Sequence, residues 1–314
     1  MLEGGSLMLK VDTCCKSYRV GAFGGGELLA VRNVSFGVHP GEVVSLIGES
    51  GSGKSTIGKM ILRLLKVTRG NIVFDGVDIS TLGGRALKAY YADVQGVFQD
   101  PFSSYNPIFK ADRVFTMLRS EYFSGLSAAD WHAKLEKSLD AVSLNPGDVL
   151  GKYPHQLSGG QLQRMLIARA LMLDIRLLVA DEIISMLDAS TRIDVLNLLG
   201  DLKSRGLGIL FITHDLSLGN YISDKTMILR RGNVVELGTT ELVFGNPVHP
   251  YTKTLLASVP QLHTKWKDLE AELGATLTAG NGAGAVPELE PSAELVEVEA
   301  GHFAALDGKG EASP

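Results

Sequence analysis

Residues 48–56 constrain the fold more than any other segment. They read Gly-Glu-Ser-Gly-Ser-Gly-Lys-Ser-Thr, which fits the phosphate-binding pattern G-x-x-x-x-G-K-[ST]. The apolar run 42–47 before this segment predicts a strand. The stretch 55–65 after it predicts a helix with one apolar side, made of Ile57, Met60, Ile61 and Leu64. A strand, a glycine-rich turn and a helix form the unit that such a loop requires.

The residue types in this segment suit a polyphosphate. Glycine allows the backbone to wrap closely around phosphate oxygens that a Cβ would obstruct, and the N–H groups at the start of a helix favour negative charge. Lys54 would lie between two phosphates, and Ser55 would offer its hydroxyl to Mg²⁺. The alternative is a glycine-rich turn with a coincidental lysine, which the flanking strand and helix disfavour. The candidate nucleotide-binding residues are Gly48, Ser50, Gly51, Ser52, Gly53, Lys54, Ser55 and Thr56.

A second apolar run, at 177–182, ends in two carboxylates and reads Leu-Leu-Val-Ala-Asp-Glu. A strand ending in this way puts Asp181 at the carboxyl edge of a sheet, beside the glycine-rich loop. There Asp181 can hold Mg²⁺ through water, because this ion gives up its hydration shell reluctantly. Glu182 is the candidate general base for an attacking water. For an isolated Asp-Glu pair the alternative is a solvated strand end.

Strands and helices alternate along the chain, which predicts an α/β fold with a mainly parallel sheet covered on both faces. Residues 112–150 favour helices, with apolar side chains at helical spacing. The dipeptide Asp75-Gly76 predicts a hairpin between 71–74 and 77–79. Further strands are expected at 7–11, 31–38, 177–180 and 209–213, and further helices at 159–173 and 191–204.

Composition narrows the class of protein. The net charge of −5 argues against a broad nucleic-acid-binding face. The 2 cysteines, Cys14 and Cys15, are adjacent, which suits a reducing cytosol and offers no metal-ligand spacing. No apolar run approaches the roughly 20 residues that cross a bilayer, and the N-terminus has no basic-then-apolar leader. We therefore expect any work at a membrane to proceed by docking from the cytoplasmic side.

Residues 157–161 read Leu-Ser-Gly-Gly-Gln and precede Leu162-Gln163-Arg164. Together with the two motifs above, this segment resembles the signature of the ABC superfamily of ATPases. The resemblance implies that the signature of one subunit closes over the ATP of a second one, because each chain already holds a nucleotide in its own loop. The γ-phosphate would then meet Ser158, Gly159, Gly160 and Gln161. Read alone, Ser158 could equally be the N-cap of a helix.

The same resemblance implies the ABC ATPase fold, with a P-loop NTPase core, an antiparallel β subdomain and a helical subdomain at about 100–172. The ATPase domain would occupy 1–260, and 261–314 would form a partly flexible tail, with flexibility centred on 274–287 and one strand near 295–299. ATP and Mg²⁺ are the implied cofactors, and hydrolysis of ATP is the implied reaction.

Four more residues match elements of this family in order. Gln99, in Val-Phe-Gln-Asp-Pro, would contact Mg²⁺ or the attacking water, and His214, in Ile-Thr-His-Asp, would contact the γ-phosphate. Asp188, in Ser-Met-Leu-Asp, would reach the opposite subunit or simply cap the next helix. Tyr18 would stack on adenine, although an aromatic residue in an edge strand often only packs.

One departure concerns Ile183-Ile184, where the family usually has Pro-Thr. Loss of the proline releases a fixed φ and restores an N–H donor, and two β-branched residues favour extended structure. We expect the loop after Glu182 to be set differently, with hydrolysis retained.

Residues 246–260 read Asn-Pro-Val-His-Pro-Tyr-Thr-Lys-Thr-Leu-Leu-Ala-Ser-Val-Pro, which resembles a tail element of ATPases that serve oligopeptide, dipeptide and nickel importers. Many such relatives carry cysteines after this element, whereas this chain has none there, which excludes an iron–sulfur cluster. Residues 296–305 resemble the closing strand of that tail.

This branch implies a peripheral protein at the cytoplasmic face of the cell membrane, with no nucleic-acid partner. Its partners would be a second ABC ATPase, identical or paralogous, two membrane permease subunits and an extracytoplasmic solute-binding protein. Two alternatives stay open: a soluble ABC ATPase acting in DNA repair or translation, and a subunit with a degraded site. The transported solute is not encoded in the motifs of this chain.

Overall fold

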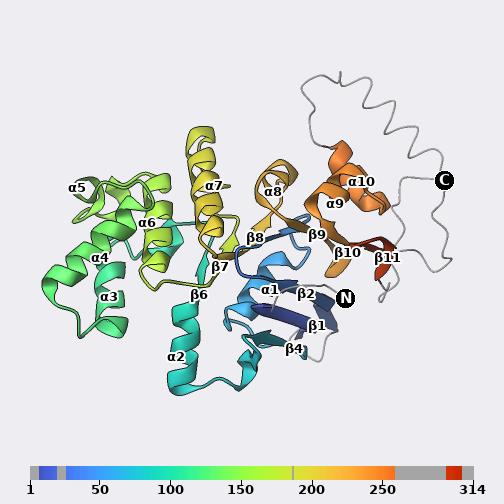
Figure 1. The fold of residues 1–314 in the computed structure, drawn as a ribbon, viewed down its shortest axis with the longest axis horizontal. Coiled ribbons are helices and arrows are strands. Elements are labelled where there is room, and N and C mark those ends of the chain that lie inside the picture. The colour runs from blue at the N-terminus through green and yellow to red at the C-terminus, as the bar shows by residue number, and fades with distance from the viewer. Residues whose placement is uncertain (1–6, 20–25, 186, 259–294, 306–314) are drawn as a thin grey trace.

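The computed structural model describes residues 7–19, 26–185, 187–258 and 295–305. An eight-stranded sheet with the order β11-β12-β10-β9-β3-β8-β7-β6 forms its centre (Figure 1). Neighbours from β9 to β6 run parallel, and the remaining pairs are antiparallel, which confirms the predicted mainly parallel sheet. The parallel strands are β3 (Val43–Ile47), β6 (Val94–Val97), β7 (Leu177–Asp181), β8 (Gly208–Thr213) and β9 (Lys225–Arg230).

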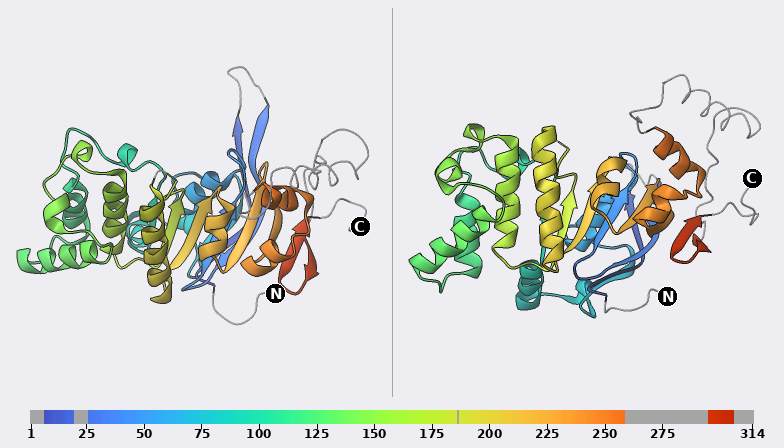
Figure 2. Two further views of the ribbon diagram at one scale, coloured as in Figure 1. Left: turned by 90° about the horizontal axis from the view of Figure 1, so that it is seen from above. Right: turned by 45° about the horizontal axis from the view of Figure 1, so that its top comes forward.

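A second, four-stranded antiparallel sheet has the order β2-β1-β4-β5. Its strands are β1 (Leu9–Arg19), β2 (Glu27–Val38), β4 (Arg69–Phe74) and β5 (Val77–Asp78). The predicted hairpin at Asp75-Gly76 is confirmed, since both residues have positive φ angles of 48° and 76°, as a tight two-residue turn requires. The far ends of β1 and β2 project from the body of the molecule (Figure 2).

Residues of the central strands alternate between two apolar clusters, as strand geometry requires. Val44, Leu210 and Ile212 pack with α1 and the antiparallel sheet, whereas Val43, Ile209 and Phe211 pack with α6 and α7. The parallel sheet is therefore covered on both faces, as expected. Because α1 lies between the two sheets, the loop that leads into it is held by buried structure on both sides.

Helices α3 to α6 gather at one end of the molecule, and α9, α10 and the C-terminal strands lie at the other (Figures 1 and 2). This confirms a helical region within 112–150. The helices are α1 (Lys54–Ile61), α2 (Gly84–Asp93), α3 (Arg113–Tyr122), α4 (Ala128–Asp140), α5 (Pro146–Val149), α6 (Gly159–Leu171), α7 (Ala189–Ser204), α8 (Leu216–Ile222), α9 (Thr240–Gly245) and α10 (Pro250–Ala257). Single 3₁₀ turns span Ile79–Thr81, Phe102–Ser104 and Pro154–Gln156.

Two sequence expectations need correction. The helix after the glycine-rich loop ends at Ile61 and not at residue 65, because Arg63 adopts a left-handed φ of 54° that an α-helix does not accommodate. Leu64, expected on the apolar side, is consequently 58% exposed. The tail contributes two strands rather than one, β11 (Leu295–Glu299) and β12 (His302–Ala305).

The hairpin formed by β11 and β12 joins the central sheet, since β12 pairs with β10 (Asn233–Thr239). The expected flexible stretch 274–287 lies outside the described residues. Among the helices that the structure describes, none combines the length and apolar character needed to span a membrane.

Candidate nucleotide site

A cavity of about 670 Å³ opens at the carboxyl end of β3. Its walls come from the glycine-rich loop, the end of β7, the end of β8, the segment after β6 and α10. The structure thus gathers most of the predicted site residues from distant parts of the chain. The lining residues are Ala30, Ile47, Gly48, Glu49, Ser50, Gly51, Gly53, Lys54, Ser55, Thr56, Gln99, Glu182, His214 and Leu255.

Glycine is needed at position 53 for two independent reasons. Its φ of 105° lies in a region that side chains rarely adopt, and a Cβ there would lie 2.6 Å from the carbonyl oxygen of Ala30. Since that oxygen belongs to the backbone of β2, it is not free to move aside. The close approach therefore fixes the path of the loop into α1, whose first N–H groups have no partner inside the helix.

Lys54 is only 4% exposed, although it carries a charge. Its Nζ donates to the carbonyl oxygens of Gly48 and Glu49, at 2.7 and 2.8 Å. Burial lowers the pKa of Lys54, whereas the nearby carboxylates of Glu182 and Asp181 act to raise it. The ammonium group is thus held inside a loop whose amides and charge are suited to phosphate oxygens.

Ser55 and Asp181 supply oxygen atoms at the edge of this loop. Ser55 Oγ donates to Asp181 Oδ1 at 3.1 Å. Burial raises the pKa of Asp181, and the hydrogen bond from Ser55 partly counters this rise. Because Mg²⁺ prefers hard oxygen ligands and a carboxylate, these two side chains fit the ion that the sequence motif implies.

Glu182 points into the cavity from the end of β7. Its Oε1 lies 3.2 Å from His214 Nδ1, and its side chain is 17% exposed against 57% for that of His214. The backbone of Glu182 has a left-handed φ of 51°, and its N–H donates to the carbonyl of Ile212 on β8 at 2.9 Å. A non-glycine residue in this conformation carries strain, which this hydrogen bond helps to maintain.

Ile183 and Ile184, the departure from the family pattern, are each 1% exposed. Both belong to the apolar cluster that packs around α6 and α7. Neither residue lines the cavity. Both side chains instead anchor the loop after Glu182 in the core. Burial of both side chains restrains this loop although no proline fixes its φ angle.

Gln99 lines the cavity from the segment that follows β6. That segment is fastened to α6, because Gln163 Nε2 donates to the carbonyl of Phe98 at 3.4 Å. Arg169, also on α6, donates to the carbonyl of Gly96 at 3.2 Å. The helix that begins at the signature segment therefore also supports the backbone beside Gln99.

The signature residues and Asp188 do not line this cavity. Ser158 Oγ accepts from the N–H of Gln161, and Gln161 Oε1 accepts from the N–H of Ser158, so the pair forms a capping box at the start of α6. Asp188 caps α7 and accepts from the hydroxyl of Ser190 and from the N–H and hydroxyl of Thr191. The hydrogen bond from Ser190, followed by those from Thr191, lowers the pKa of Asp188. Both alternative interpretations of these residues as caps are thus realised in the single chain.

Tyr18 also lies off the cavity lining. It is the second-last residue of β1, toward the end of the hairpin that projects in Figure 2. The Nζ of Lys16 lies 5.2 Å from the centre of its ring. Stacking of Tyr18 on adenine stays a prediction.

Sequence reasoning did not assign four of the cavity residues, namely Ala30, Ile47, Glu49 and Leu255. Ala30 belongs to no motif, Ile47 was expected only as the end of the strand before the loop, and Glu49 occupies a variable position of the loop pattern. Leu255 comes from α10, which the sequence marked only through its His-Pro-Tyr element as a sign of the family branch. That element was the available signal, but a single sequence gives no hint that it folds back onto the loop.

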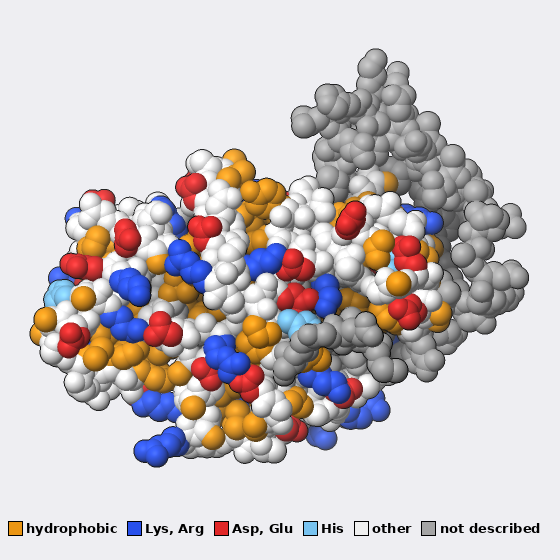
Figure 3. All heavy atoms as spheres, in the orientation of Figure 1, with side chains coloured by type: hydrophobic (Ala, Val, Ile, Leu, Met, Phe, Trp, Pro, Cys, Tyr) orange, Lys and Arg blue, Asp and Glu red, His pale blue; other side chains and the backbone are white. Residues whose placement is uncertain are grey.

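Figure 3 shows one face of the molecule, on which basic and acidic side chains are interspersed. The described part of this face carries no continuous basic stripe. Such a distribution gives no electrostatic footprint for nucleic acid on the face in view.

The fold and the cavity define a nucleotide-binding cassette of the P-loop class. Residues 31–185 match the family described as "ABC transporter", and residues 235–284 match that described as "Oligopeptide/dipeptide transporter, C-terminal region". The oligopeptide transport ATP-binding protein OppF of Streptococcus mutans is 41% identical over 262 residues, which cover 83% of this chain and 84% of that protein. This chain belongs to the ABC transporter ATP-binding family.

Two further relatives carry import-related names. A putative peptide import ATP-binding protein of Brucella ovis is 41% identical over 81% of this chain and 78% of its own length. The glutathione import ATP-binding protein GsiA of Salmonella typhi is 43% identical over 74% of this chain but only 37% of its own length.

Solved structures agree on the fold. A dimeric ATP-binding cassette in a post-hydrolysis state with bound ADP and phosphate superposes with a TM-score of 0.67 at 29% identity, over 74% of this chain and 99% of that one. The protein cbiO1 of Clostridium perfringens, described as part of the ABC transporter complex cbiONQ, gives a TM-score of 0.66 at 24% identity, over 79% of this chain and 95% of that one.

Proposed function

We propose that this chain is the ATP-hydrolysing subunit of an ABC importer for peptides or a related solute. The observation that carries the proposal is the match of residues 235–284 to the oligopeptide/dipeptide transporter region in a chain whose cavity gathers the ATPase residues. The relatives named for peptide and glutathione import support the same solute class. This match favours an importer over a soluble ABC ATPase of DNA repair or translation.

In the proposed reaction, the γ-phosphate of ATP is transferred to water. Lys54 and the loop amides bind the phosphates, and the carboxylate of Glu182 accepts a proton from the attacking water. His214 lies beside Glu182 and would orient this carboxylate and contact the γ-phosphate. Ser55 and Asp181 would hold Mg²⁺, which when bound neutralises charge on the phosphates, and Gln99 would position the water or the ion.

The site is incomplete within one chain, because the signature residues lie off the cavity. We infer that Ser158 to Gln161 and Asp188 face the nucleotide of a second ABC ATPase in a head-to-tail dimer. The capping box uses Ser158 Oγ as an acceptor, so its O–H proton stays available for a phosphate oxygen. ATP bound between two such half-sites would close the dimer, and hydrolysis would reopen it.

As part of an importer, this subunit would act on two permease subunits at the cytoplasmic face of the membrane. An extracytoplasmic solute-binding protein would deliver the solute to these permeases. The proposed domains are an ATPase domain, 1–260, with a helical subdomain near 100–172, and a tail, 261–314.

A tagged chain purified from gently solubilised membranes of its own host tests the assembly. Two permeases, a second ATPase and a binding protein would support the proposal, whereas recovery with ribosomes or DNA would overturn it.

ATP turnover by the purified complex separates an active subunit from one with a degraded site. We expect phosphate release that depends on ATP and Mg²⁺. Absence of turnover in a complex with an intact, nucleotide-binding partner would favour the degraded subunit.

A further inference from the structure

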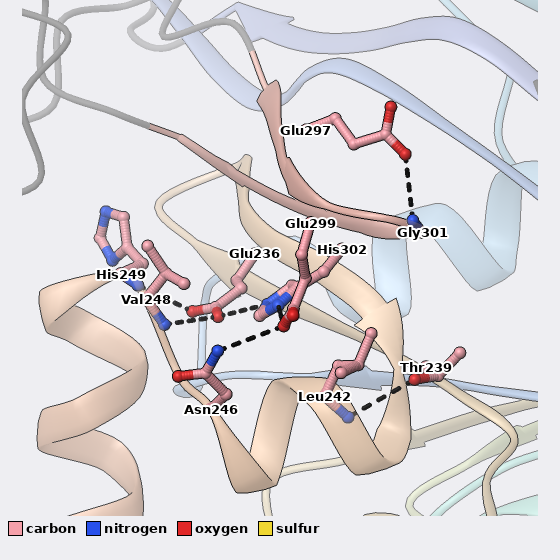
Figure 4. Close-up of polar contacts among 10 residues, drawn as sticks. All are labelled: Glu236, Thr239, Leu242, Asn246, Val248, His249, Glu297, Glu299, Gly301 and His302. Carbon is pink, nitrogen blue, oxygen red and sulfur yellow. Dashed lines mark hydrogen bonds and ion pairs between the residues drawn. The ribbon is translucent and has the colours of Figure 1, made fainter.

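The C-terminal hairpin is fastened to the core by a buried polar contact. His302, on β12, has no exposed surface, and its Nε2 lies 2.8 Å from Oε1 of Glu236, on β10, which is also fully buried (Figure 4). The other ring nitrogen, Nδ1, lies 3.1 Å from Glu299 Oε1, and Asn246 Nδ2 donates to the same oxygen at 3.2 Å. A buried carboxylate is costly unless it is hydrogen-bonded, so these groups depend on one another.

Glu236 extends this contact into the His-Pro-Tyr element. Its two carboxylate oxygens accept from the N–H groups of Val248 and His249, at 2.8 and 3.0 Å (Figure 4). These are the residues immediately before α10. The Glu236 carboxylate thus contacts β12 through His302 and hydrogen-bonds the segment before α10. These contacts fix where the helix starts.

The N-cap and the first residue of α10 define where this helix begins. His249 Nδ1 accepts from the N–H of Tyr251 at 3.0 Å, so His249 is the N-cap. Pro250 occupies the first turn, where a residue without an N–H is tolerated. Together these local contacts define the helix start that Glu236 holds.

Tyr251 reaches from α10 to the phosphate-binding loop. It is 4% exposed, and its hydroxyl oxygen accepts from the N–H of Glu49 at 3.4 Å. The guanidinium of Arg230 lies 5.1 Å from the centre of its ring. Glu49 itself lines the cavity, and so does Leu255, one turn along α10 from Tyr251.

We propose that α10 is a functional wall of the nucleotide site, and that the C-terminal hairpin holds this wall in place through His302 and Glu236. Leu255 is assigned as a nucleotide-contacting residue and Tyr251 as a positioning residue for the loop at Glu49. His302 is a positioning residue that acts through Glu236. This inference rests on the proposed nucleotide binding and assigns a role to the tail.

The chemistry of the lining indicates which part of the nucleotide meets this wall. An apolar side chain does not compensate charge, so Leu255 suits the uncharged base or ribose rather than the phosphates. Ala30 adds a second small apolar surface to the cavity. The glycine-rich loop and Lys54 provide the polar side of the same cavity, which leaves the phosphates to them.

Binding of ADP with Mg²⁺, measured by isothermal titration calorimetry on the purified full chain, tests the wall. Leu255→Ala should weaken binding about three- to tenfold, as expected for loss of an apolar contact of this size. Leu256→Ala is the matched control, because Leu256 packs in the same cluster as Leu255 but does not line the cavity. Equal affinities of the two variants would overturn the assignment of Leu255.

Tyr251→Phe removes the hydroxyl that accepts from Glu49 and keeps the ring. We expect about two- to tenfold weaker ADP binding, the range for loss of one hydrogen bond. Lys253→Ala, at an exposed position of the same helix, should bind ADP as the unmodified chain does. Unchanged affinity in Tyr251→Phe would remove Tyr251 from the proposal.

A double-mutant cycle tests the role of the hairpin. His302→Ala should weaken ADP binding, and it should add little to the loss already present in the double variant Tyr251→Phe/Leu255→Ala, because it acts through these residues. Fully additive losses would overturn the coupling. If His302→Ala does not fold, His302→Gln keeps a polar side chain for Glu236, and the cycle is run with it.

The outcomes separate this inference from the proposed function. If the unmodified chain binds no ADP, the proposed function fails. If it binds ADP and every variant of α10 and β12 binds equally well, the proposed function stands and the wall is refuted.

Discussion

Ser55 and Asp181 are joined by a 3.1 Å hydrogen bond between residues 126 positions apart. Ser55 follows β3 in α1, and Asp181 ends β7, with β8 lying between these strands in the sheet. The oxygen pair is therefore assembled by the order of the parallel strands, whose carboxyl ends meet at one edge. Ligand oxygens that are already in place need no reorganisation when an ion arrives.

The raised pKa of Asp181 predicts a pH-dependent effect on stability. An acid whose pKa is higher in the folded state than in the unfolded state favours folding while protonated, and this contribution is lost as the pH rises through the folded pKa. At pH 7 the charged Asp181 therefore costs stability, mainly through burial. We expect Asp181→Asn, without nucleotide and in EDTA, to melt above the unmodified protein at pH 7, with a difference that shrinks toward pH 4.

Bound ATP and Mg²⁺ should reverse which of these two proteins has the higher melting temperature at pH 7. A ligand at 100 times its Kd stabilises the folded state by about 2.7 kcal/mol, and Asp181→Asn should lose most of this gain with Mg²⁺ and ATP. Thermal unfolding of both proteins across this pH range measures both effects, with the exposed Asp201→Asn as control. A lower melting temperature of the nucleotide-free variant at pH 7 would contradict the role given to burial.

Lys54→Ala should weaken nucleotide binding. Lys54 is 4% exposed, and its ammonium group already lies among the loop carbonyls. A hydrogen bond to a charged group contributes about 1.5–3 kcal/mol. The loss corresponds to roughly ten- to 150-fold in Kd. Titration with ADP measures it, and Lys59→Ala, an exposed lysine on the same helix, should change the Kd less than about twofold. Similar losses of ADP affinity in both variants would show that the positive charge of the helix matters, and not a direct contact between Lys54 and the phosphates.

Sequence predicted those parts of the fold and site that local patterns specify. The loop, the carboxylates after β7 and the alternating strands and helices each carry their own signal. The early end of α1 depends on Arg63 in a left-handed conformation, which no residue type there announces. The position of Leu255 in the cavity lining and the contact of Tyr251 with Glu49 depend on α10 folding back onto a loop about 200 residues earlier in the chain. Such contacts leave no local pattern.

The C-terminal hairpin illustrates the same limit. Alternation at 295–299 indicated one strand, but β12 has the more buried face, because His302, Ala304 and Ala305 are buried. The four residues of β12 read His-Phe-Ala-Ala, a run too short to show clear alternation by itself. Its partner Glu236 lies on β10, 66 positions earlier, so only the tertiary structure shows why this strand forms.

Ile184 provides a test of how the loop after Glu182 is anchored. Ile184→Val removes one methyl group from the core and should cost about 0.5–1.5 kcal/mol of unfolding free energy. Ile184→Thr has the shape of valine but buries a hydroxyl, and should cost about 1–3 kcal/mol more. Urea unfolding of the two variants measures the difference. Equal stabilities would show that the hydroxyl finds a partner, and that the core tolerates the threonine common in the family.

Glu182→Gln should trap an ATP-bound dimer. The amide keeps the size of the side chain but accepts no proton at neutral pH, so the attacking water loses its base while the phosphate-binding groups stay intact. We expect a drop in turnover of at least about a hundredfold, within the range for general-base catalysis. Size-exclusion chromatography with ATP and Mg²⁺ should show dimer that the unmodified protein does not accumulate. His214→Ala should also slow turnover, because it removes the contact 3.2 Å from Glu182. Rapid multiple-turnover hydrolysis by Glu182→Gln would show that another group accepts the proton, and the role of Glu182 would then be limited to the architecture of the loop.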